Sequence, residues 1–594
     1  MKRSRWLGGV LIAMAGPVVV WTGAQAGSPV QQPGTSETES AGGQVPTYQA
    51  NANLVLVDVV VRDKRGPIEG LKASDFQVAE DGQPQTITTF EEHRATDAVQ
   101  AVEAPPLPPH VYSNAPTYRR TSAVNVLLLD ALNTEAHDQT WVRQRMVKYL
   151  HLVPPGTQLA VFTLASQLRM VSGFTTNVGM IEQALGTKRT PTENSRLVDP
   201  GGDAAEKSVT DAMLSSMPAA EEGAMAQEVR EFEADRAVFQ GEQRLEITLA
   251  AMDELGRYLS EIPGRKNLIW FSGAFPMQFG MDDAGGKGTQ LQDYSPRMAQ
   301  IEAELARARV AVYPADARGL LTMPLFGDGG MDAGADPQAA VGNDEAFLNS
   351  VGRPQGTMRE IARQTGGEAY VNTNAVGQAV EKAIADGSSY YTLGYAPKRA
   401  EEPGQYRTIA VKLEETADRG QDELSYRRGY FTEDPGQTGG PASQQLSPMS
   451  TALEQGAPPL SQLIFQVRVL AANDPAARGM RVASGPAGDL AKTLQGPVER
   501  YLIDATIDPR VLALKPLAGG WRRAELEIAV EAFSADAVRL NGRDQGVQID
   551  VTPGNGVRPL DLHEEIDVPV GTVSLRIAVR DVASGRIGTV EVQE

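Results

Sequence analysis

Cysteine is absent from the 594-residue sequence, and histidine occurs only five times. The lack of cysteine excludes disulfide bonds, thiolate nucleophiles and cysteine-ligated zinc or iron–sulfur sites. No H-E-x-x-H pair occurs, and no two histidines have the spacing of metal ligands on a helix. The G-x-S-x-G motif and the glycine-rich phosphate loops are also missing after the predicted strands. Hydrolase and nucleotide chemistry therefore lack their usual residues.

Basic residues are fewer than acidic ones. The formal charge of −20 becomes −23 once the three cations of the N-terminal segment are removed. A surface of this sign repels nucleic acid and anionic lipid, and it favours cationic partners or divalent ions. We therefore expect no nucleic-acid partner.

Residues 1–26 are typical of a secretory signal peptide. Basic residues precede an apolar run from Trp6 to Trp21, and Ala24-Gln25-Ala26 forms a small-x-small cleavage pattern. An uncleaved membrane anchor is the alternative, but the run is short and is interrupted by Pro17. No later segment approaches the roughly 20 apolar residues of a spanning helix. We expect an exported protein, periplasmic, in the cell envelope or secreted, with no membrane span after signal cleavage.

Residues 123–387 alternate apolar strands, such as "VNVLLLD" and "KNLIWFSG", with amphipathic helices. This alternation predicts a parallel sheet covered on both faces. A segment rich in Met, Ala and Glu, at about 186–240, interrupts the pattern as an insertion. The flanking segments 47–93 and 388–432 are rich in β-strand signals. Because each is marginal alone, we expect the two flanks to form one sandwich.

Residues 461–594 contain alternating strands at the spacing of an immunoglobulin-like sandwich. We interpret the segments between the folded units as linkers: 27–46, 94–122 and 433–460. The predicted fold class is therefore multidomain α/β plus all-β. A doubly wound, Rossmann-type domain is flanked by β-sandwich segments and followed by an immunoglobulin-like domain.

Polar side chains stand at or just after the ends of the predicted strands, where ligands bind in open α/β sheets. They are Asp130, Asn133, Thr134, Ser272 and Asp316. Asp130 is either the first ligand of a metal site or a strand end whose carboxylate caps a helix or bonds loop amides. Asp316 is either part of the same face or a turn aspartate that pairs with Arg318.

Several stretches of residues 47–432 together resemble a known family: "NLVLVDVVVRDKRGPIEGLKASDFQVAEDGQPQTITTFEE", "VLLLDALNT", "PGRKNLIWFSGAFP", "VAVYPADARGL" and "YYTLGYAP". They are similar to the von Willebrand factor type A domain, and more narrowly to the VWFA-related domain of exported bacterial proteins, especially those of Acidobacteria. This resemblance implies a doubly wound vWA-like domain that binds proteins. Many such domains hold Mg²⁺ or Mn²⁺ at a metal-ion-dependent adhesion site.

The resemblance also assigns roles to single residues. That metal site uses a D-x-S-x-S loop, a Thr from a second loop and an Asp after the fourth strand. Asp130 matches the first Asp and Thr134 can stand for the second Ser, which makes these two the expected metal ligands. Leu132 occupies the middle Ser position and Ser272 the later Asp position, so the site is degenerate. Candidates for the loop threonine are Thr176 and Thr248.

These observations predict an exported, non-enzymatic protein of binding or adhesion type. Its vWA-like domain would bind a protein partner, and its degenerate site would hold Mg²⁺ or Mn²⁺ or no cofactor at all. One alternative is a structural scaffold of the cell envelope that has no metal site. Another is a metal-dependent envelope hydrolase using Asp130 and Asp316, which would lack a histidine base.

Overall fold

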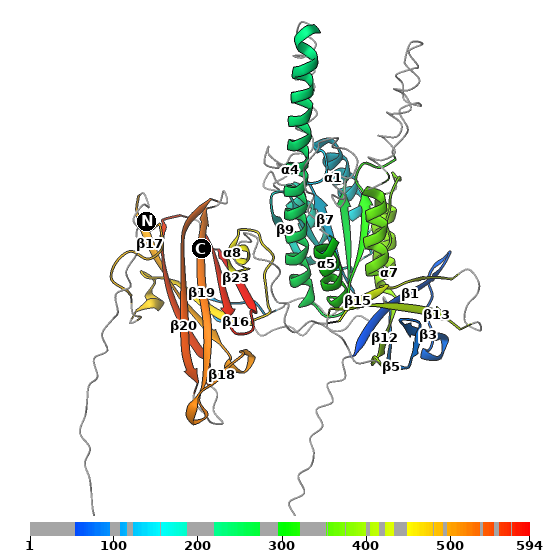
Figure 1. Ribbon diagram of the computed structural model, residues 1–594. Helices are drawn as coiled ribbons and strands as arrows, with labels where there is room; N and C mark the ends of the chain where they lie inside the picture. The colour runs from blue at the N-terminus through cyan, green and yellow to red at the C-terminus, as the bar shows by residue number, and fades with distance from the viewer. Residues whose placement is uncertain are drawn as a thin grey trace, which may run out of the picture. The chain divides into compact units, whose positions relative to one another are not determined.

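The computed structural model describes residues 54–94, 107–115, 123–186, 219–273, 295–320, 352–398, 404–414, 422–432, 448–534 and 538–593, apart from positions 152, 155, 353, 375, 479, 481, 491–495, 552–557 and 572. Within these ranges the chain is a mixed structure of helices and five β-sheets (Figure 1). The predicted combination of α/β and β-rich parts is confirmed at this level. The predicted signal peptide and the linker 27–46 lie outside the described residues.

A five-stranded sheet forms the centre of the α/β domain, in the order β11-β10-β7-β8-β9. Its strands run parallel except β9, which pairs antiparallel to β8. A continuous apolar run places apolar side chains on both faces of its strand. These strands are therefore stable only where other elements cover both faces of the sheet. Their bounds are β7 (Ala123–Asp130), β8 (Leu159–Leu164), β9 (Leu168–Thr175), β10 (Arg265–Ser272) and β11 (Val310–Asp316).

Helices cover both faces of this sheet (Figure 1). Successive strand residues point to opposite faces, and Trp270 and Ile269 of β10 accordingly enter different cores. Trp270 packs in the core that contains Leu255, whereas Ile269 packs in the core that contains Met146. The helices are α1 (Ala136–Leu150), α2 (Val178–Gly186), α4 (Ala219–Ser260), α5 (Ser295–Arg307) and α7 (Val376–Ser388).

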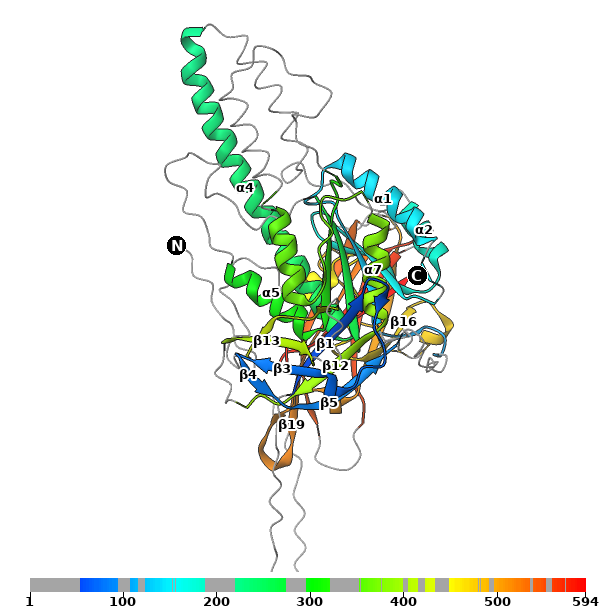
Figure 2. The ribbon, with the colours of Figure 1, turned by 90° about the vertical axis from the view of Figure 1, so that its right-hand side faces the viewer.

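Helix α4 is longer than the sequence pattern predicted. Residues 219–240 belong to the predicted insertion, yet they form the first half of this helix and continue without a break to Ser260. This composition, rich in Ala, Glu and Met, has high helix propensity. The first half of the helix extends beyond the sheet (Figures 1 and 2). The rest of the predicted insertion, residues 187–218, lies outside the described residues.

The two β-rich flanks of the α/β domain pair with each other and form a unit that we call the β platform (Figure 2). In one sheet β1 lies between β12 and β14, and in the other β13 lies between β3 and β15. A shared core includes Val57, Val78 and Leu393. The strands are β1 (Val55–Asp63), β2 (Gly66–Pro67), β3 (Phe76–Glu80), β4 (Gln83–Gln85), β5 (Ile87–His93), β12 (Tyr390–Tyr395), β13 (Tyr406–Leu413), β14 (Glu423–Ser425) and β15 (Gly429–Phe431).

Buried charges connect the β platform to the α/β domain. The guanidinium of Arg62 on β1 donates to Asp386 of α7 at 2.9 Å and also contacts Glu368. Arg309, which follows α5, donates to Asp58 of β1 at 2.9 Å. Ion pairs with so little exposure depend on both partners, because a lone buried charge is costly. These pairs therefore fix how β1 sits against the α/β domain.

Lys266, at the start of β10, is a buried cation at the same junction. It is 2% exposed, and its Nζ donates to the carbonyl oxygen of Ala308 at 2.6 Å. Burial, reinforced by Arg309, lowers the pKa of Lys266 from 10.5 to about 7, although Asp58 acts in the opposite sense. The unfolded chain therefore binds more protons than the folded chain between about pH 7 and pH 10. Stability is expected to rise with pH across that window.

Replacing this lysine by methionine should stabilise the protein near neutral pH. We expect Lys266→Met to raise the free energy of unfolding by about 1–3 kcal/mol at pH 7, because the cost of burying a cation exceeds one lost hydrogen bond. The gain should shrink towards pH 10. Urea unfolding followed by tryptophan fluorescence measures both values, with the exposed Lys412→Met as the matched control. A variant less stable than the wild type at both pH values would contradict this account.

The C-terminal segment forms two antiparallel sheets around one core, which includes Phe465 and Ile503 from one sheet and Ile528 and Ile577 from the other. Whether its topology is immunoglobulin-like stays a prediction. The first sheet contains β16 (Phe465–Ala471), β17 (Val498–Ile507) and β21 (Leu560–Pro569). The second contains β18 (Lys515–Pro516), β19 (Arg522–Ser534), β20 (Arg539–Val551), β22 (Val573–Asp581) and β23 (Ile587–Gln593).

A strand from the predicted linker 94–122 completes the first of these sheets. Strand β6 (Val111–Ser113) pairs antiparallel with the edge of β16. The side chain of Asn114 then donates to the carbonyl oxygens of Leu460 at 2.9 Å and Leu463 at 2.8 Å. Pairing covers an edge whose backbone groups would otherwise remain open. This part of the Pro-rich segment is therefore structural and not only a spacer.

The predicted linker 433–460 is also partly ordered. It contains helix α8 (Pro448–Leu453), in which Met449 and Leu453 are buried. Short 3-10 turns complete the described secondary structure at Ala73–Asp75, Pro475–Ala477, Pro509–Val511 and Ala518–Gly520. Among the described helices, none is long and apolar enough to cross a membrane.

Candidate functional site

The candidate site lies where the strand order of the α/β sheet reverses. From β7 the chain proceeds through β8 to β9 on one side, and β10 and β11 then lie on the other side. In open α/β sheets, the carboxyl ends of the strands at such a reversal border the crevice where ligands bind. Asp130 ends β7 and Ser272 ends the neighbouring β10. The two side chains therefore meet at this position.

The carboxylate of Asp130 is surrounded by hydrogen-bond donors. Its Oδ1 accepts from the backbone N–H of Asn133 at 2.9 Å. Its Oδ2 accepts from Asn133 Nδ2 at 2.9 Å, Ser272 Oγ at 2.8 Å and Trp270 Nε1 at 3.2 Å. Asp130 is 2% exposed and Ser272 is 1% exposed. The carboxylate thus joins the ends of β7 and β10 to the loop that follows β7.

Thr134 and Thr248 extend this arrangement. Thr134 Oγ1 accepts from the backbone N–H of Gly273 at 2.8 Å, which ties the loop after β7 to the residue that follows β10. A Cβ at Gly273 would lie 3.1 Å from the carbonyl oxygen of Asn133, so glycine permits the close approach of the two loops. Thr248 of α4 accepts from Asn133 Nδ2 at 3.0 Å. We call Asp130, Asn133, Thr134, Trp270 and Ser272 the Asp130 cluster.

The electrostatics of the Asp130 cluster follow from its burial. Removal from water raises the pKa of Asp130 above its usual range, and the hydrogen bonds from Asn133, Ser272 and Trp270 act against that rise. No cation among the described residues acts on this carboxylate, and a buried carboxylate without one requires such donors. The cluster therefore replaces water around Asp130 with fixed protein groups.

Asp316 belongs to a neighbouring but separate set of contacts. It lies beside Ser272 in the register of β10 and β11. Its carboxylate accepts from Arg318 Nε and Nη2, both at 2.9 Å, and from Gln355 Nε2 at 3.1 Å. The structure therefore brings Asp130, Asn133, Thr134 and Ser272 together, whereas Asp316 pairs with Arg318 as in the alternative interpretation of its sequence. Thr176 follows antiparallel β9 and so lies at the opposite edge of the sheet.

The donor set that the described residues provide around Asp130 does not fit a magnesium or manganese site. Such ions need several oxygen ligands in near-octahedral geometry and usually keep bound water. The only carboxylate of the Asp130 cluster already accepts four hydrogen bonds, and the indole N–H of Trp270 is a donor that repels a cation. Leu132, at the middle Ser position of the motif, is fully buried in the apolar core and has no side-chain oxygen to bind a metal ion. An adjoining cavity of about 20 Å³ has room for roughly one water molecule.

Trp270 also belongs to the site, although the sequence motifs do not indicate it. Its indole contacts Asp130 across 140 positions of the chain, a pairing that no local pattern indicates. One feature of the sequence does indicate that Trp270 belongs to the site. Trp270 and Ser272 are two residues apart on a strand, so their side chains lie on the same face of the sheet. Among the described residues, no cluster of three or more His, Asp or Glu side chains is arranged to hold a metal ion.

Comparisons with known proteins add structural likenesses only. No family model matches the chain, and no curated protein matches it. Similar solved structures include an aerotolerance-related membrane protein from Bacteroides fragilis, at 10% identity and a TM-score of 0.22, covering 44% of this chain and 98% of that chain. BatB from Bacteroides thetaiotaomicron has 9% identity and a TM-score of 0.20, covering 45% and 97%. A von Willebrand factor type A protein from Catenulispora acidiphila has 10% identity and a TM-score of 0.20, covering 59% and 75%. TM-scores this low do not establish a shared fold.

Proposed function

We propose that the chain is an exported, non-enzymatic binding protein whose vWA-like α/β domain binds a protein partner at the carboxyl edge of its sheet. In this proposal the degenerate adhesion site is a hydrogen-bonded structural cluster, and binding requires no metal ion. The signal-peptide pattern supports export. The protein would act in the periplasm, in the cell envelope or outside the cell.

The observation that carries this proposal is the saturated Asp130 carboxylate at the reversal point of the sheet. An α/β enzyme places a nucleophile, a base or a cofactor at this position. Among the described residues, the side chains at this position are buried and bonded to each other, so they present no reactive group to a substrate. A rigid edge of this kind suits recognition, because little conformational entropy is lost when it binds.

Leu320 is the residue at this edge whose substitution should best reveal whether a partner binds there. It follows β11, is 53% exposed and is held by a bond of its backbone N–H to Asn374 Oδ1 at 2.9 Å. In this proposal a partner bound at this edge covers the exposed Leu320 side chain. Asp316 and Arg318, which precede it, fix the turn through their ion pair.

The scaffold alternative is favoured by a different observation. Exposed apolar side chains occur on the C-terminal sandwich, where Val538 and Val570 are each 60% exposed. Val570 lies beside the start of β17, because its backbone N–H donates to Pro497. If the C-terminal sandwich makes the contacts, these residues and not Leu320 should be covered by the partner.

A paired substitution distinguishes the two functions. The mature protein, Leu320→Asp and Val570→Asp are each cross-linked to an envelope extract, and captured proteins are quantified by mass spectrometry. We expect a captured protein whose yield falls about tenfold or more with Leu320→Asp, is unchanged with Val570→Asp and is unaffected by EDTA. Loss with Val570→Asp alone would support the scaffold and contradict the proposal. Loss caused by EDTA would contradict metal-independent binding.

A further inference from the structure

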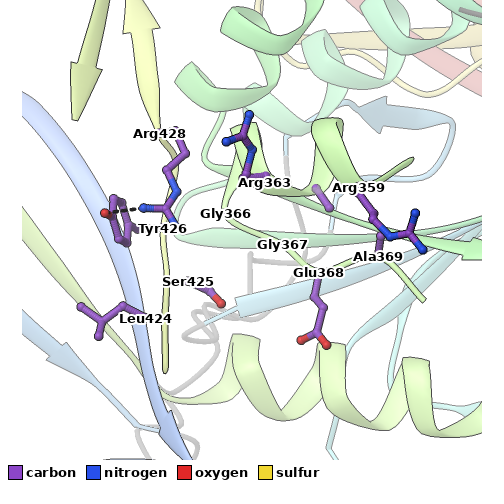
Figure 3. A pocket seen from close by; sticks show the side chains of 11 residues that line it. Arg359, Arg363, Gly366, Gly367, Glu368, Ala369, Leu424, Ser425, Tyr426 and Arg428 are labelled. Carbon is purple, nitrogen blue, oxygen red and sulfur yellow. Dashed lines mark hydrogen bonds between the residues drawn. The ribbon is translucent and has the colours of Figure 1, made fainter. Parts of the chain in front are cut away.

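A second site, unrelated to the Asp130 cluster, lies between the α/β domain and the β platform. A pocket of about 270 Å³ opens between the helical segment 354–365, the turn 366–369 and residues 424–428 (Figure 3). The carbonyl oxygen of Gly366 accepts from Arg265, the first residue of β10. The pocket therefore lies near the amino ends of the strands, at the edge opposite the candidate site.

Arginines line the pocket from both walls. Arg359 and Arg363 are four residues apart on the helical segment and so lie on one face of it. Arg428 comes from the β platform, on the other side of the pocket (Figure 3). Its guanidinium carbon lies 4.3 Å from the centre of the Tyr426 ring and Nη1 donates to the Tyr426 hydroxyl, which holds the group in place. In a chain with a formal charge of −20, this is a local concentration of cations.

The positive charge of these arginines is only partly neutralised. Arg363 pairs with Glu360, and both side chains are about half exposed. Such exposed pairs are weak and exchange readily for another anion. For Arg359, the structure shows no ion pair or hydrogen bond of the side chain with another described residue. Glu368, the acidic residue of the pocket lining, is bonded instead to Arg62 and Lys382 and points away from the three guanidinium groups (Figure 3).

Backbone contacts hold the two walls together. Thr365 and Arg427 form an antiparallel bridge, and the backbone N–H of Arg428 donates to the carbonyl oxygen of Gln364 at 3.3 Å. Gly366 has φ +79°, and a Cβ there would lie 2.7 Å from the carbonyl carbon of Tyr426. Glycine therefore lets the turn touch the segment between β14 and β15 and close one side of the pocket. The arginines are thus carried on a fixed frame.

We propose that this pocket binds a carboxylate attached to a small apolar group, as found at the C-terminal residue of a peptide. Guanidinium groups bind carboxylates through parallel hydrogen bonds. The apolar side chains of Ala362, Ala369 and Leu424 would contact the body of such a ligand. A phosphate with nearly two negative charges fits less well, because the acidic Glu368 also lines this pocket. The inference does not depend on the proposed function, since it uses another edge of the domain.

Calorimetric titration of the mature full chain tests this site. The probes are N-acetyl-dialanine with a free carboxylate, the same peptide as its C-terminal amide, N-acetyl-glutamate diamide as a side-chain carboxylate, and inorganic phosphate. We expect the free C-terminal acid to bind with a dissociation constant on the order of 0.1–1 mM and the amide at least tenfold more weakly. The side-chain carboxylate and phosphate should both bind more weakly than the C-terminal acid.

Substitution of Arg359 locates the binding. Because this side chain is exposed and forms no ion pair or hydrogen bond with another described residue, Arg359→Glu should leave the unfolding temperature unchanged and weaken binding of the C-terminal acid about tenfold or more. The control is Arg523→Glu, a charge reversal on the C-terminal sandwich, which should leave the affinity unchanged. Equal binding of acid and amide, or unchanged affinity in Arg359→Glu, would overturn the proposal. Tighter binding of phosphate than of the C-terminal acid would overturn the assignment to a carboxylate.

Discussion

Replacing Arg62 by methionine is expected to lower the free energy of unfolding by about 3–5 kcal/mol, the usual cost of removing one partner of a buried ion pair. The side chain of Arg62 is 10% exposed and that of Asp386 is 3% exposed, so water cannot replace the lost guanidinium. The substitution also removes a contact of Glu368. Urea unfolding of the full chain, followed by tryptophan fluorescence, measures this loss.

The pH dependence of this loss has a defined sign. Burial raises the pKa of Asp386, and Arg62 acts against that rise. Without Arg62 the pKa should rise further, so the folded variant binds a proton more tightly than its unfolded chain. The cost of the substitution should therefore be greatest at neutral pH and shrink as the pH falls and Asp386 becomes protonated. A loss that is constant with pH would contradict the assignment to this carboxylate.

A matched control separates the effect of burying an ion pair from the effect of removing an arginine charge. Arg510 forms an ion pair with Asp508 on the surface of the C-terminal sandwich, where the arginine side chain is 75% exposed. Arg510→Met removes the same type of charge from a solvated pair, and such pairs contribute little. We expect its unfolding curve to coincide with that of the wild type. If both variants lose the same stability, the junction between the β platform and the α/β domain does not depend on buried charge.

Replacing Asp130 by alanine is the second large effect that we expect, a loss of about 3–5 kcal/mol in the free energy of unfolding. The substitution leaves the donors of Asn133, Trp270 and Ser272 without their acceptor in a buried space, and each unsatisfied group costs about 1–3 kcal/mol. Because the carboxylate serves the fold, the loss should be the same in 10 mM Mg²⁺ and in EDTA. Urea unfolding in the two buffers measures it.

Two further variants check the role of the carboxylate. Ser272→Ala removes one donor and leaves the acceptor with three others, so we expect a loss of only about 1 kcal/mol. Asp130→Asn places an amide N–H towards a donor. Its loss in the free energy of unfolding should therefore fall between those of Ser272→Ala and Asp130→Ala. A stability of Asp130→Ala equal to that of the wild type would show that the cluster is not structural.

Much of the α/β domain could be predicted from the sequence because its strands are local apolar runs. The stretch 124–130 forms a buried strand that ends at an aspartate, as the pattern indicated. Four of the five candidate side chains meet because the carboxyl ends of neighbouring parallel strands share one edge. The pairing of the flanks could be anticipated on similar grounds, since two marginal sets of strands need each other to bury a core.

Other features depend on contacts between distant residues and could not be predicted from local patterns. Strand β6 forms because Val111–Ser113 meets the edge of β16, more than 340 positions further along the chain. The hydrogen bond from the Trp270 indole to Asp130 likewise joins residues that are distant in the chain. Asp316 was grouped with Asp130 by its place at a strand end, but its side chain pairs locally with Arg318. A position at a strand end predicts the edge of the sheet where a residue lies. It does not predict the residue with which the side chain pairs.

Calorimetric titration of Mg²⁺ and Mn²⁺ into the mature protein and into Asp130→Ala tests the central claim most directly, namely that Asp130 is a structural acceptor and not a metal ligand. We predict no saturable heat from either protein at concentrations up to about 1 mM, because the carboxylate is already occupied by protein donors. Submillimolar binding to the wild type that disappears in a folded Asp130→Ala would contradict the account.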